Sequence, residues 1–227
     1  GKDNYHGVGG PLSVSDQKIQ LPLLNEFQNA AEEFGIPKTK DFNTGDNHGC
    51  GYFQVTEKDG FRCSTAVGYL NPIKNRNNLK IITNCHVKKI NFENKTAKNV
   101  EYWQKNELKK VSANKEIILS TGSIGSPQIL QTSGIGNSKK LRELGIDMVQ
   151  ELKGVGENLQ DHLMFRPIYK VHGIKSLNKK INSLFGKLMI GLEYIFNRSG
   201  PMTMGASQMC MFAKSDPSLE LPDLQWH

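Results

Sequence analysis

The sequence lacks the features that would mark a membrane-spanning, fibrous or metal-binding protein. No stretch approaches the roughly 18 to 20 uncharged apolar residues that a transmembrane helix needs. The 22 glycines follow no three-residue period, and apolar clusters are too frequent for a disordered chain. The 6 histidines include no pair spaced four apart, so we expect no metal site. What remains is typical of a soluble globular protein of 227 residues.

Cysteine is scarce and shows no recognisable spacing. There are 4 cysteines, Cys50, Cys63, Cys85 and Cys210. They form no C-x-x-C pair and fit neither a zinc site nor a small disulfide framework. We therefore expect reduced thiols in a cytoplasmic protein. The alternating run from Leu221 to His227 reads as a strand stopped partway, so we expect a segment of a longer protein.

The basic residues outnumber the acidic ones and give a formal net charge of +7. Such a charge suits nucleic acid or an anionic membrane. However, the lysines occur as scattered pairs with no aromatic residues interleaved, at 88–89, 109–110, 139–140 and 179–180. A solvated basic surface is the simpler interpretation, and we expect no nucleic-acid partner.

The middle of the chain predicts an antiparallel meander. Apolar residues alternate from Asn77 to Val87, and the pattern resumes one step out of phase at Ile90, which indicates a bulge or tight turn. A hairpin turn at 94–95 and short strands over 99–103 and 109–113 would complete it. The unbroken apolar run 116–120 then predicts a strand buried on both faces.

Helical spacing predicts four helices. The first spans Leu21 to Phe34, with Pro22 in its first turn and Gly35 as its cap, before a long loop over 38–51. The second opens at Ser126-Pro127 and ends near 133–134, and the third runs from 137 to 145. The fourth covers 181–196; its polar face is no basic stripe, so it faces a core in preference to a membrane surface. A glycine-rich loop over 153–162 lies between the third and fourth.

The segment from Ile117 to Gly136 predicts a strand, a tight turn at Thr121-Gly122, and a helix. Glycine lets a backbone approach a ligand closely, and a helix N-terminus favours an anion. This arrangement suits the binding of a dinucleotide. A packing turn in any α/β protein would show the same sequence pattern.

The spacing of several motifs resembles the glucose-methanol-choline oxidoreductase family. The run Gly122-Ser123…Ser126-Pro127…Ser133-Gly134-Ile135-Gly136 is similar to its second signature, and 154–162 resembles its Gly-Val-Gly-x-Asn-Leu-Gln-Asp-His loop. Residues 5–12 and 60–70 also fit. The resemblance implies an α/β (α+β) chain: the central part of a two-domain FAD-binding flavoprotein fold, with an antiparallel meander and a mixed-sheet substrate domain.

The resemblance also implies three FAD-binding residues. The family's adenine contact through a main chain falls on Val87, and Thr121 and Gly122 match the turn that closes on the dinucleotide. The loop holding Asn158, Asp161 and His162 would pass near the isoalloxazine. Asp161 is interpreted as a turn residue whose side chain bonds the backbone, and the role of His162 is left undecided between the loop structure and the flavin site. His86 points away from Val87 and reads as a surface or packing residue.

The implied organisation has three parts. Residues 1–52 would belong to the substrate domain, 53–163 to the FAD-binding domain, and 164–227 to the start of the main substrate segment. The sequence has no G-x-G-x-x-G and no C-terminal segment with the family's active-site histidine. We therefore assign no catalytic residue and expect the segment alone to be inactive.

The expected reaction is FAD-dependent oxidation of an alcohol to an aldehyde. Alternatives are a choline dehydrogenase, an alcohol oxidase, a cyanohydrin lyase on the same fold, or, remotely, a non-catalytic basic binding protein. The methionines at 202, 204, 209 and 211 are interpreted as core residues in preference to residues that line a substrate pocket. With no aromatic cluster beside them, we expect a neutral alcohol, a quinone or other non-oxygen acceptor, and a cytoplasmic, possibly membrane-associated enzyme.

Overall fold

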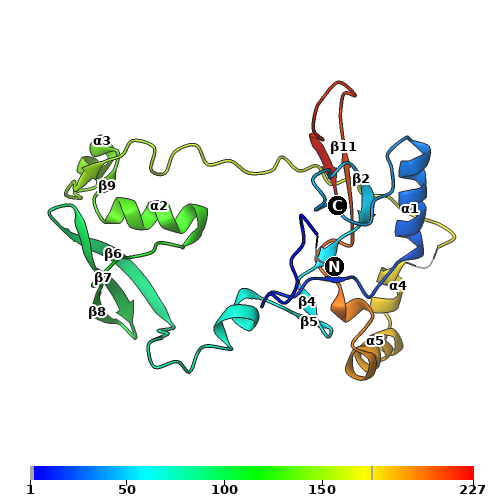
Figure 1. Cartoon of the computed structure of the whole chain (residues 1–227), viewed down its shortest axis with the longest axis horizontal. Coiled ribbons are helices and arrows are strands. Elements are labelled where there is room, and N and C mark those ends of the chain that lie inside the picture. Colours follow the sequence, from blue (N-terminus) through cyan, green and yellow to red (C-terminus); the bar gives the residue numbers. More distant parts are fainter. Residues whose placement is uncertain (1–2, 175) are drawn as a thin grey trace. The chain divides into compact units, whose positions relative to one another are not determined.

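A computed structural model describes residues 3–174 and 176–227 (Figure 1). The chain divides into two compact units: unit 1 runs to Leu79 and resumes at Tyr169, and unit 2 spans Lys80–Ile168. Both contain helices and small sheets, which confirms the expected fold class. We describe each unit by itself.

The helices of unit 1 include the first one that the sequence predicts. They are α1 (Pro22–Glu33), η1 (a π-helix, Ala66–Leu70), α4 (Leu177–Ile181), α5 (Leu184–Asn197) and η2 (Pro201–Thr203). Pro22 lies in the first turn of α1, and Gly35 follows its end at φ +94°. The Tyr52 hydroxyl accepts a hydrogen bond from the Leu21 N–H at 3.2 Å and donates to Asn25 at 2.7 Å. Tyr52 thus ties the start of α1 to a strand.

The prediction of one helix over 181–196 is wrong at its start. Helix α4 ends at Ile181, and α5 begins only at Leu184. Ser183 separates them because its side chain accepts the Gly186 N–H at 2.9 Å and so caps the new helix. The apolar spacing continues across this break, and the cap decides where the helix begins.

A three-stranded sheet forms the centre of unit 1. Its strands are β2 (Gly49–Tyr52), β11 (Met209–Ala213) and β12 (Leu224–Trp226), in the order β12-β11-β2. Strand β11 pairs antiparallel with both neighbours, and a parallel bridge joins Lys38 to Cys50 of β2. Strand β12 confirms the predicted terminal strand, whereas the predicted loop over 38–51 ends early because β2 uses its last residues. The smaller pairs are β1 (Ser15–Asp16) with β3 (Gln54–Val55), and β4 (Glu57–Lys58) with β5 (Phe61–Arg62).

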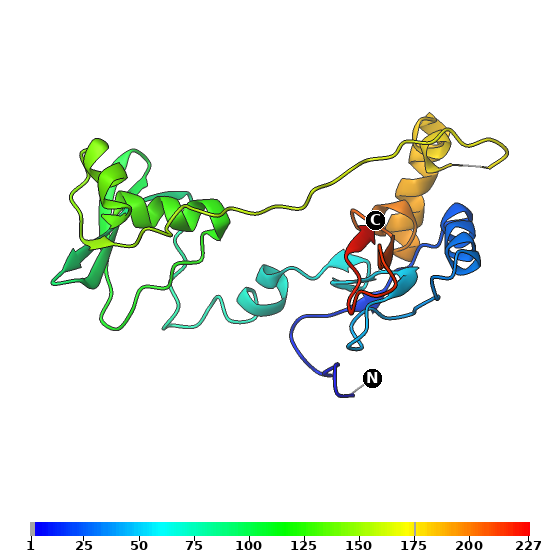
Figure 2. The same ribbon diagram turned by 90° about the horizontal axis from the view of Figure 1, so that it is seen from above.

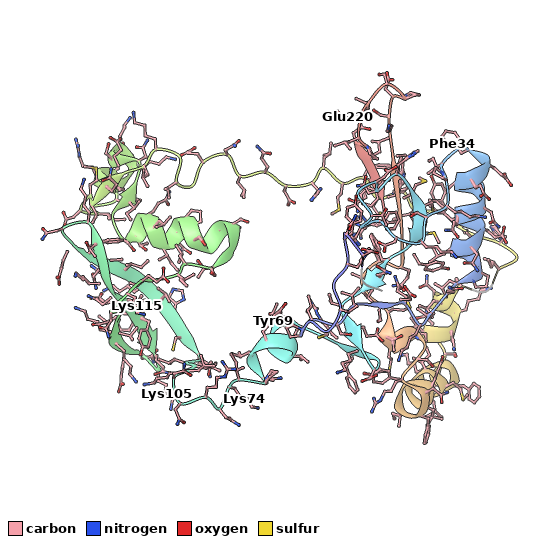
Figure 3. The ribbon with its side chains drawn as sticks, viewed as in Figure 1. Phe34, Tyr69, Lys74, Lys105, Lys115 and Glu220 are labelled. Atoms are coloured by element: carbon pink, nitrogen blue, oxygen red, sulfur yellow. The ribbon has the colours of Figure 1, made fainter. Side chains whose placement is uncertain are left out.

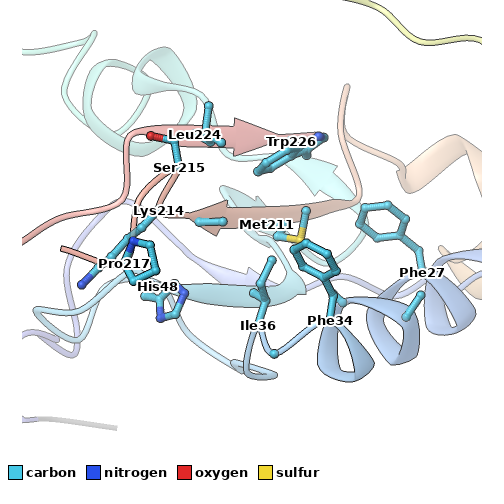
Figure 4. Close-up of a pocket in the computed structure, with 14 residues that line it drawn as sticks. Phe27, Phe34, Ile36, His48, Met211, Lys214, Ser215, Pro217, Leu224 and Trp226 are labelled. Carbon is cyan, nitrogen blue, oxygen red and sulfur yellow. The ribbon is translucent and has the colours of Figure 1, made fainter. Parts of the chain in front are cut away.

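The core of unit 1 lies where α1 meets this sheet. It is formed by Ala31, Ile36, Cys50, Met209, Met211 and Ala213. Beside it, a groove of about 830 Å³ runs between α1 and strands β11 and β12, with Phe34 and Trp226 on its walls (Figure 4). Met209 and Met211 are therefore core residues, as expected, while Met202 is 56% exposed.

Unit 2 contains the predicted meander. Strands β6 (Cys85–Glu93), β7 (Thr96–Gln104) and β8 (Glu107–Ser112) pair antiparallel in that order. Asn94 and Lys95 form the hairpin turn with φ of 47° and 64°, as a type I′ turn requires. The register shifts between Val87 and Lys89 and again between Asn91 and Phe92, which confirms the predicted irregularity.

The first strand of the meander begins later than predicted. Asn77–Asn84 is not part of any strand, and β6 starts at Cys85. Asn84 adopts the left-handed conformation at φ 56°, which interrupts an extended chain. Strand β7 also ends at Gln104, the partner of Cys85, so the residues before Cys85 have no ladder to join.

The rest of unit 2 consists of short elements beside the meander. They are α2 (Gly122–Thr132), β9 (Ile135–Gly136), α3 (Ser138–Glu143) and β10 (Gln150–Glu151). Strands β9 and β10 pair in parallel, and α2 lies against β6 (Figure 2). Helix α3 confirms the predicted third helix, and Asn137 caps it by accepting the backbone N–H groups of Lys139 and Lys140.

Two predictions at the start of α2 are wrong. Residues 116–120 form no strand, and Ile118 is 79% exposed. A strand buried on both faces needs neighbours on its edges, and no strand in the described residues pairs with this run. The helix begins at Gly122 instead of Ser126, and Pro127 lies inside it. Pro127 removes only one bond from the ladder there, and the helix continues to Thr132.

Candidate functional site: the α2 turn and the β6 edge

The turn at Thr121-Gly122 is the N-terminus of α2. Thr121 is the N-cap residue, and Gly122 follows with φ +79°, a conformation that favours glycine. The Ser126 hydroxyl lies 3.3 Å from the Thr121 backbone nitrogen and accepts its hydrogen; the two hydroxyls are 3.1 Å apart. Ser126 was predicted to begin the helix. It instead reaches back from inside the helix and fixes the turn.

This turn has the properties that a phosphate-bearing ligand requires. Among the described residues no side chain caps the N-terminus of α2, and its first turn contains no acidic residue. A Cβ placed on Gly122 would meet no atom within 4 Å. The backbone is therefore open to close approach, and the helix dipole favours a negative charge there. The residues present fit the diphosphate part of a dinucleotide.

Val87, the second predicted contact, lies half-buried on β6, the edge strand of the meander. It pairs with Tyr102, and the bulge directly after it displaces Lys88 from the ladder. The Lys88 carbonyl accepts the Thr132 hydroxyl at 3.1 Å, and the Ile90 N–H donates to Ser133 at 2.8 Å. The edge of β6 next to Val87 is thus held against the C-terminal end of α2.

The predicted residues therefore lie at opposite ends of one helix. Thr121 and Gly122 begin α2, and the neighbours of Val87 contact its last residue, Thr132. The 11 residues of α2 span about 16 Å at 1.5 Å per residue. A ligand that meets both predicted contacts would therefore have to extend along α2.

A residue that the sequence did not single out connects α2 to the glycine-rich loop. The Gln131 side chain donates to the Val155 carbonyl at 3.1 Å, and a Cβ on Gly156 would lie 2.5 Å from the Gln131 Nε2. A side chain at position 156 would therefore displace the Gln131 amide, and the φ of +81° there favours glycine. Gln131 lies within the signature segment, but nothing in the sequence indicates its contact 24 residues away.

The loop after Gly156 bears on two further expectations. The Asp161 carboxylate accepts the His162 backbone N–H at 2.8 Å, which agrees with the turn role expected of Asp161. Asn158 has φ 56°, a conformation that asparagine tolerates better than most residues. His162 and His86 are both exposed. These contacts give His162 no catalytic partner among the described residues.

Within residues 3–174 and 176–227, no three His, Cys, Asp or Glu side chains gather as metal ligands would. None of the helices described there combines the length and the hydropathy needed to cross a bilayer.

Residues 2–164 match the family model described as GMC oxidoreductase. The chain belongs to the GMC oxidoreductase family. A relative from Pseudomonas putida named alcohol dehydrogenase [acceptor] is 39% identical over 229 residues, which is 100% of this chain and 41% of the relative. An oxygen-dependent choline dehydrogenase from Vibrio vulnificus is 40% identical over the same shares.

Solved structures support the same assignment. An FAD-dependent oxidoreductase from Chaetomium thermophilum matches with a TM-score of 0.80 and 28% identity, over 91% of this chain and 37% of that one. This GMC oxidoreductase chain thus spans about two fifths of the length of the curated relatives it matches.

Proposed function

We propose that this chain is a portion of an FAD-dependent enzyme that oxidises an alcohol to an aldehyde. The observation that carries the proposal is the match of the whole chain to relatives named as alcohol and choline dehydrogenases. A bound flavin would supply the acceptor for the hydride that leaves the carbinol carbon. The catalytic base is not among the residues that we assign.

In this proposal the chain holds the adenosine-diphosphate side of FAD. The first-turn N–H groups of α2 would receive the diphosphate, with Thr121 and Gly122 as the closest backbone. The Val87 main chain would meet adenine at the edge of β6. The open space at Gly122 and the dipole of α2 support this arrangement. Residues 53–163 would then form the FAD-binding portion, between substrate-domain portions over 1–52 and 164–227.

We infer a neutral primary alcohol, a quinone or other non-oxygen acceptor, and a cytoplasmic enzyme that associates peripherally with a membrane. Met209 and Met211 are buried in the core of unit 1, and Met211 also lines the groove beside α1. Choline is the second candidate substrate because several similar relatives are named choline dehydrogenases.

The test of cofactor binding compares two glycines in the full-length protein. Gly122 and Gly145 both have positive φ, and a Cβ at either meets nothing within 4 Å. Gly122→Val and Gly145→Val therefore impose similar backbone strain. We expect only Gly122→Val to lose flavin, because its side chain would occupy the space that the cofactor needs. The ratio of flavin to protein absorbance after purification measures this, and undiminished flavin in Gly122→Val would refute the assignment.

Steady-state kinetics tests the proposed substrate and the proposed electron acceptor. Aliphatic alcohols are compared with choline, each with an artificial dye and with oxygen as acceptor. A kcat/KM for choline well above that of every neutral alcohol would reject the neutral substrate. Rapid peroxide formation would reject the non-oxygen acceptor.

A further inference from the structure

One face of the meander gathers basic and apolar side chains that are scattered in the sequence. Paired residues of an antiparallel sheet share a face. One cross-strand row consists of His86, Trp103 and Leu108, and the next consists of Lys89, Glu101 and Lys110. Trp103 and Glu101 are two residues apart, so both rows lie on the same side of the sheet.

The bulge adds a third lysine to this face. Lys88 is displaced from the ladder, and its ammonium lies 5.9 Å from the centre of the Trp103 ring and 3.9 Å from the Glu101 carboxylate. We call the set Lys88, Lys89, Glu101, Trp103, Leu108 and Lys110 the basic face. Figure 3 shows the side chains that these strands carry, with Lys105 labelled at the β7–β8 turn.

The basic face carries a net positive charge, and its residues are exposed except for Lys89 and Glu101, which are half-buried. Trp103 is 40% exposed and Leu108 46%, and the Lys88 side chain is 44% exposed. A single carboxylate, Glu101, lies among the three lysines and accepts the Asn91 amide at 2.9 Å. That hydrogen bond, together with the lysines, lowers the pKa of Glu101. Glu101 therefore stays charged and offsets only one of the three positive charges.

We propose that the basic face docks on the surface of an anionic lipid bilayer. Trp103 and Leu108 would lie at the level of the headgroups, where an amphipathic indole is favoured. The three lysines would lie against the anionic lipid headgroups, and their alkyl stems let the ammonium groups reach them.

The arrangement favours a bilayer over a nucleic acid. Glu101 would repel either anionic partner, but the apolar side chain of Leu108 offers nothing to a phosphate backbone and is favoured at a bilayer surface. A bilayer surface accepts both the apolar row and the basic row beside it. The inference rests on the proposed peripheral membrane association, but its test uses neither turnover nor flavin, so the two can fail separately.

The experiment uses vesicle flotation, which separates bound protein from aggregates. The 227-residue chain is mixed with phosphatidylcholine vesicles with or without phosphatidylserine. Each lysine near an anionic surface contributes about five-fold to partitioning. The variant Lys88→Gln/Lys89→Gln/Lys110→Gln should therefore partition on the order of 100-fold more weakly. The control Lys115→Gln/Lys139→Gln/Lys153→Gln makes the same charge change outside β6–β8 and should stay close to the parent.

Tryptophan emission tests the same contact directly. The chain has 2 tryptophans, so Trp226→Phe leaves Trp103 as the sole reporter. Its emission should shift to shorter wavelength with phosphatidylserine vesicles and stay unchanged with phosphatidylcholine alone. Equal weakening of both triple variants, an unchanged Trp103 emission, or displacement of the vesicles by single-stranded RNA would each overturn the proposal. Far-UV circular dichroism confirms that the variants are folded.

Discussion

Gly134→Ala should destabilise unit 2 far more than the same change at another glycine of similar conformation. Gly134 is buried after α2 at φ +87°, and its carbonyl accepts the backbone N–H groups of Val149 at 2.8 Å and Gln150 at 3.2 Å. A Cβ there would press on the Asp147 carbonyl and lie 2.9 Å from a Val149 methyl group. The chain after β9 therefore has to move or the turn has to open.

The magnitude follows from two contributions. A left-handed conformation costs an L-residue about 1 to 2 kcal/mol. Overpacking against backbone adds roughly 1 to 3 kcal/mol. Gly145 at φ +67° has open space around a Cβ, so Gly145→Ala carries only the first cost. We expect Gly134→Ala to lose about 2 to 5 kcal/mol of unfolding free energy, and Gly145→Ala no more than about 2.

Urea unfolding in the Trp226→Phe background measures this difference. Trp103 then reports on unit 2 alone, because Trp226 lies in unit 1. The midpoint and slope together give the unfolding free energy of each variant. Equal losses for the two alanine variants would show that the contacts around Gly134 are not tight, and the packing argument would fail.

Three further predictions concern Val87, Asp3 and the cysteines. Val87→Ala should bind FAD almost as well as the parent. Val87→Pro should lose FAD, because proline removes the backbone N–H and breaks the strand. Normal flavin content in the proline variant would contradict the assignment of Val87. The hydrogen bond from the Tyr5 N–H, with other contacts, lowers the pKa of Asp3 to about 2. The contacts of the Asp3 carboxylate should therefore persist at neutral pH and be lost only as the pH falls through that value. An NMR titration midpoint near the ordinary 3.8 would contradict these contacts. Burial raises the pKa of Cys50 to about 11, so iodoacetamide should label the half-buried Cys85 first at neutral pH; peptide mapping that finds equal labelling would refute this.

Local patterns predicted the elements that depend on local physics. Helix α1 was predicted from its apolar spacing and from Pro22 and Gly35, and the meander from alternation and the turn at Asn94. Each of these signals acts within about ten residues of chain. The start of α5 at Leu184 was not predicted, because the apolar spacing continues through Ser183. The Ser183 side chain caps the helix there and so sets its first residue.

Elements that depend on distant partners could not be predicted in this way. Strand β2 exists because Met209 pairs with Tyr52, and no sequence pattern joins two residues so far apart. The run 116–120 has the composition of a buried strand but no partner among the described strands. In the candidate site, the signature indicated Thr121 and Gly122, whereas the contact of Gln131 with Val155 arises only from the fold.

The insertion of unit 2 within unit 1 has a consequence for the order of folding. All of unit 2 lies between Lys80 and Ile168, while the central sheet of unit 1 needs β2 and β11 from either side of that insertion. During synthesis, the meander can therefore form while β11 is still untranslated, since domains fold as units as they emerge. Strand β2 must wait, and its unpaired edge is then open to wrong partners. The pairing of β2 with β11 joins residues that are far apart in the sequence, so it is the slow step of folding. Substitutions in β2 and β11 should therefore affect the yield of folded protein more than their effect on final stability indicates.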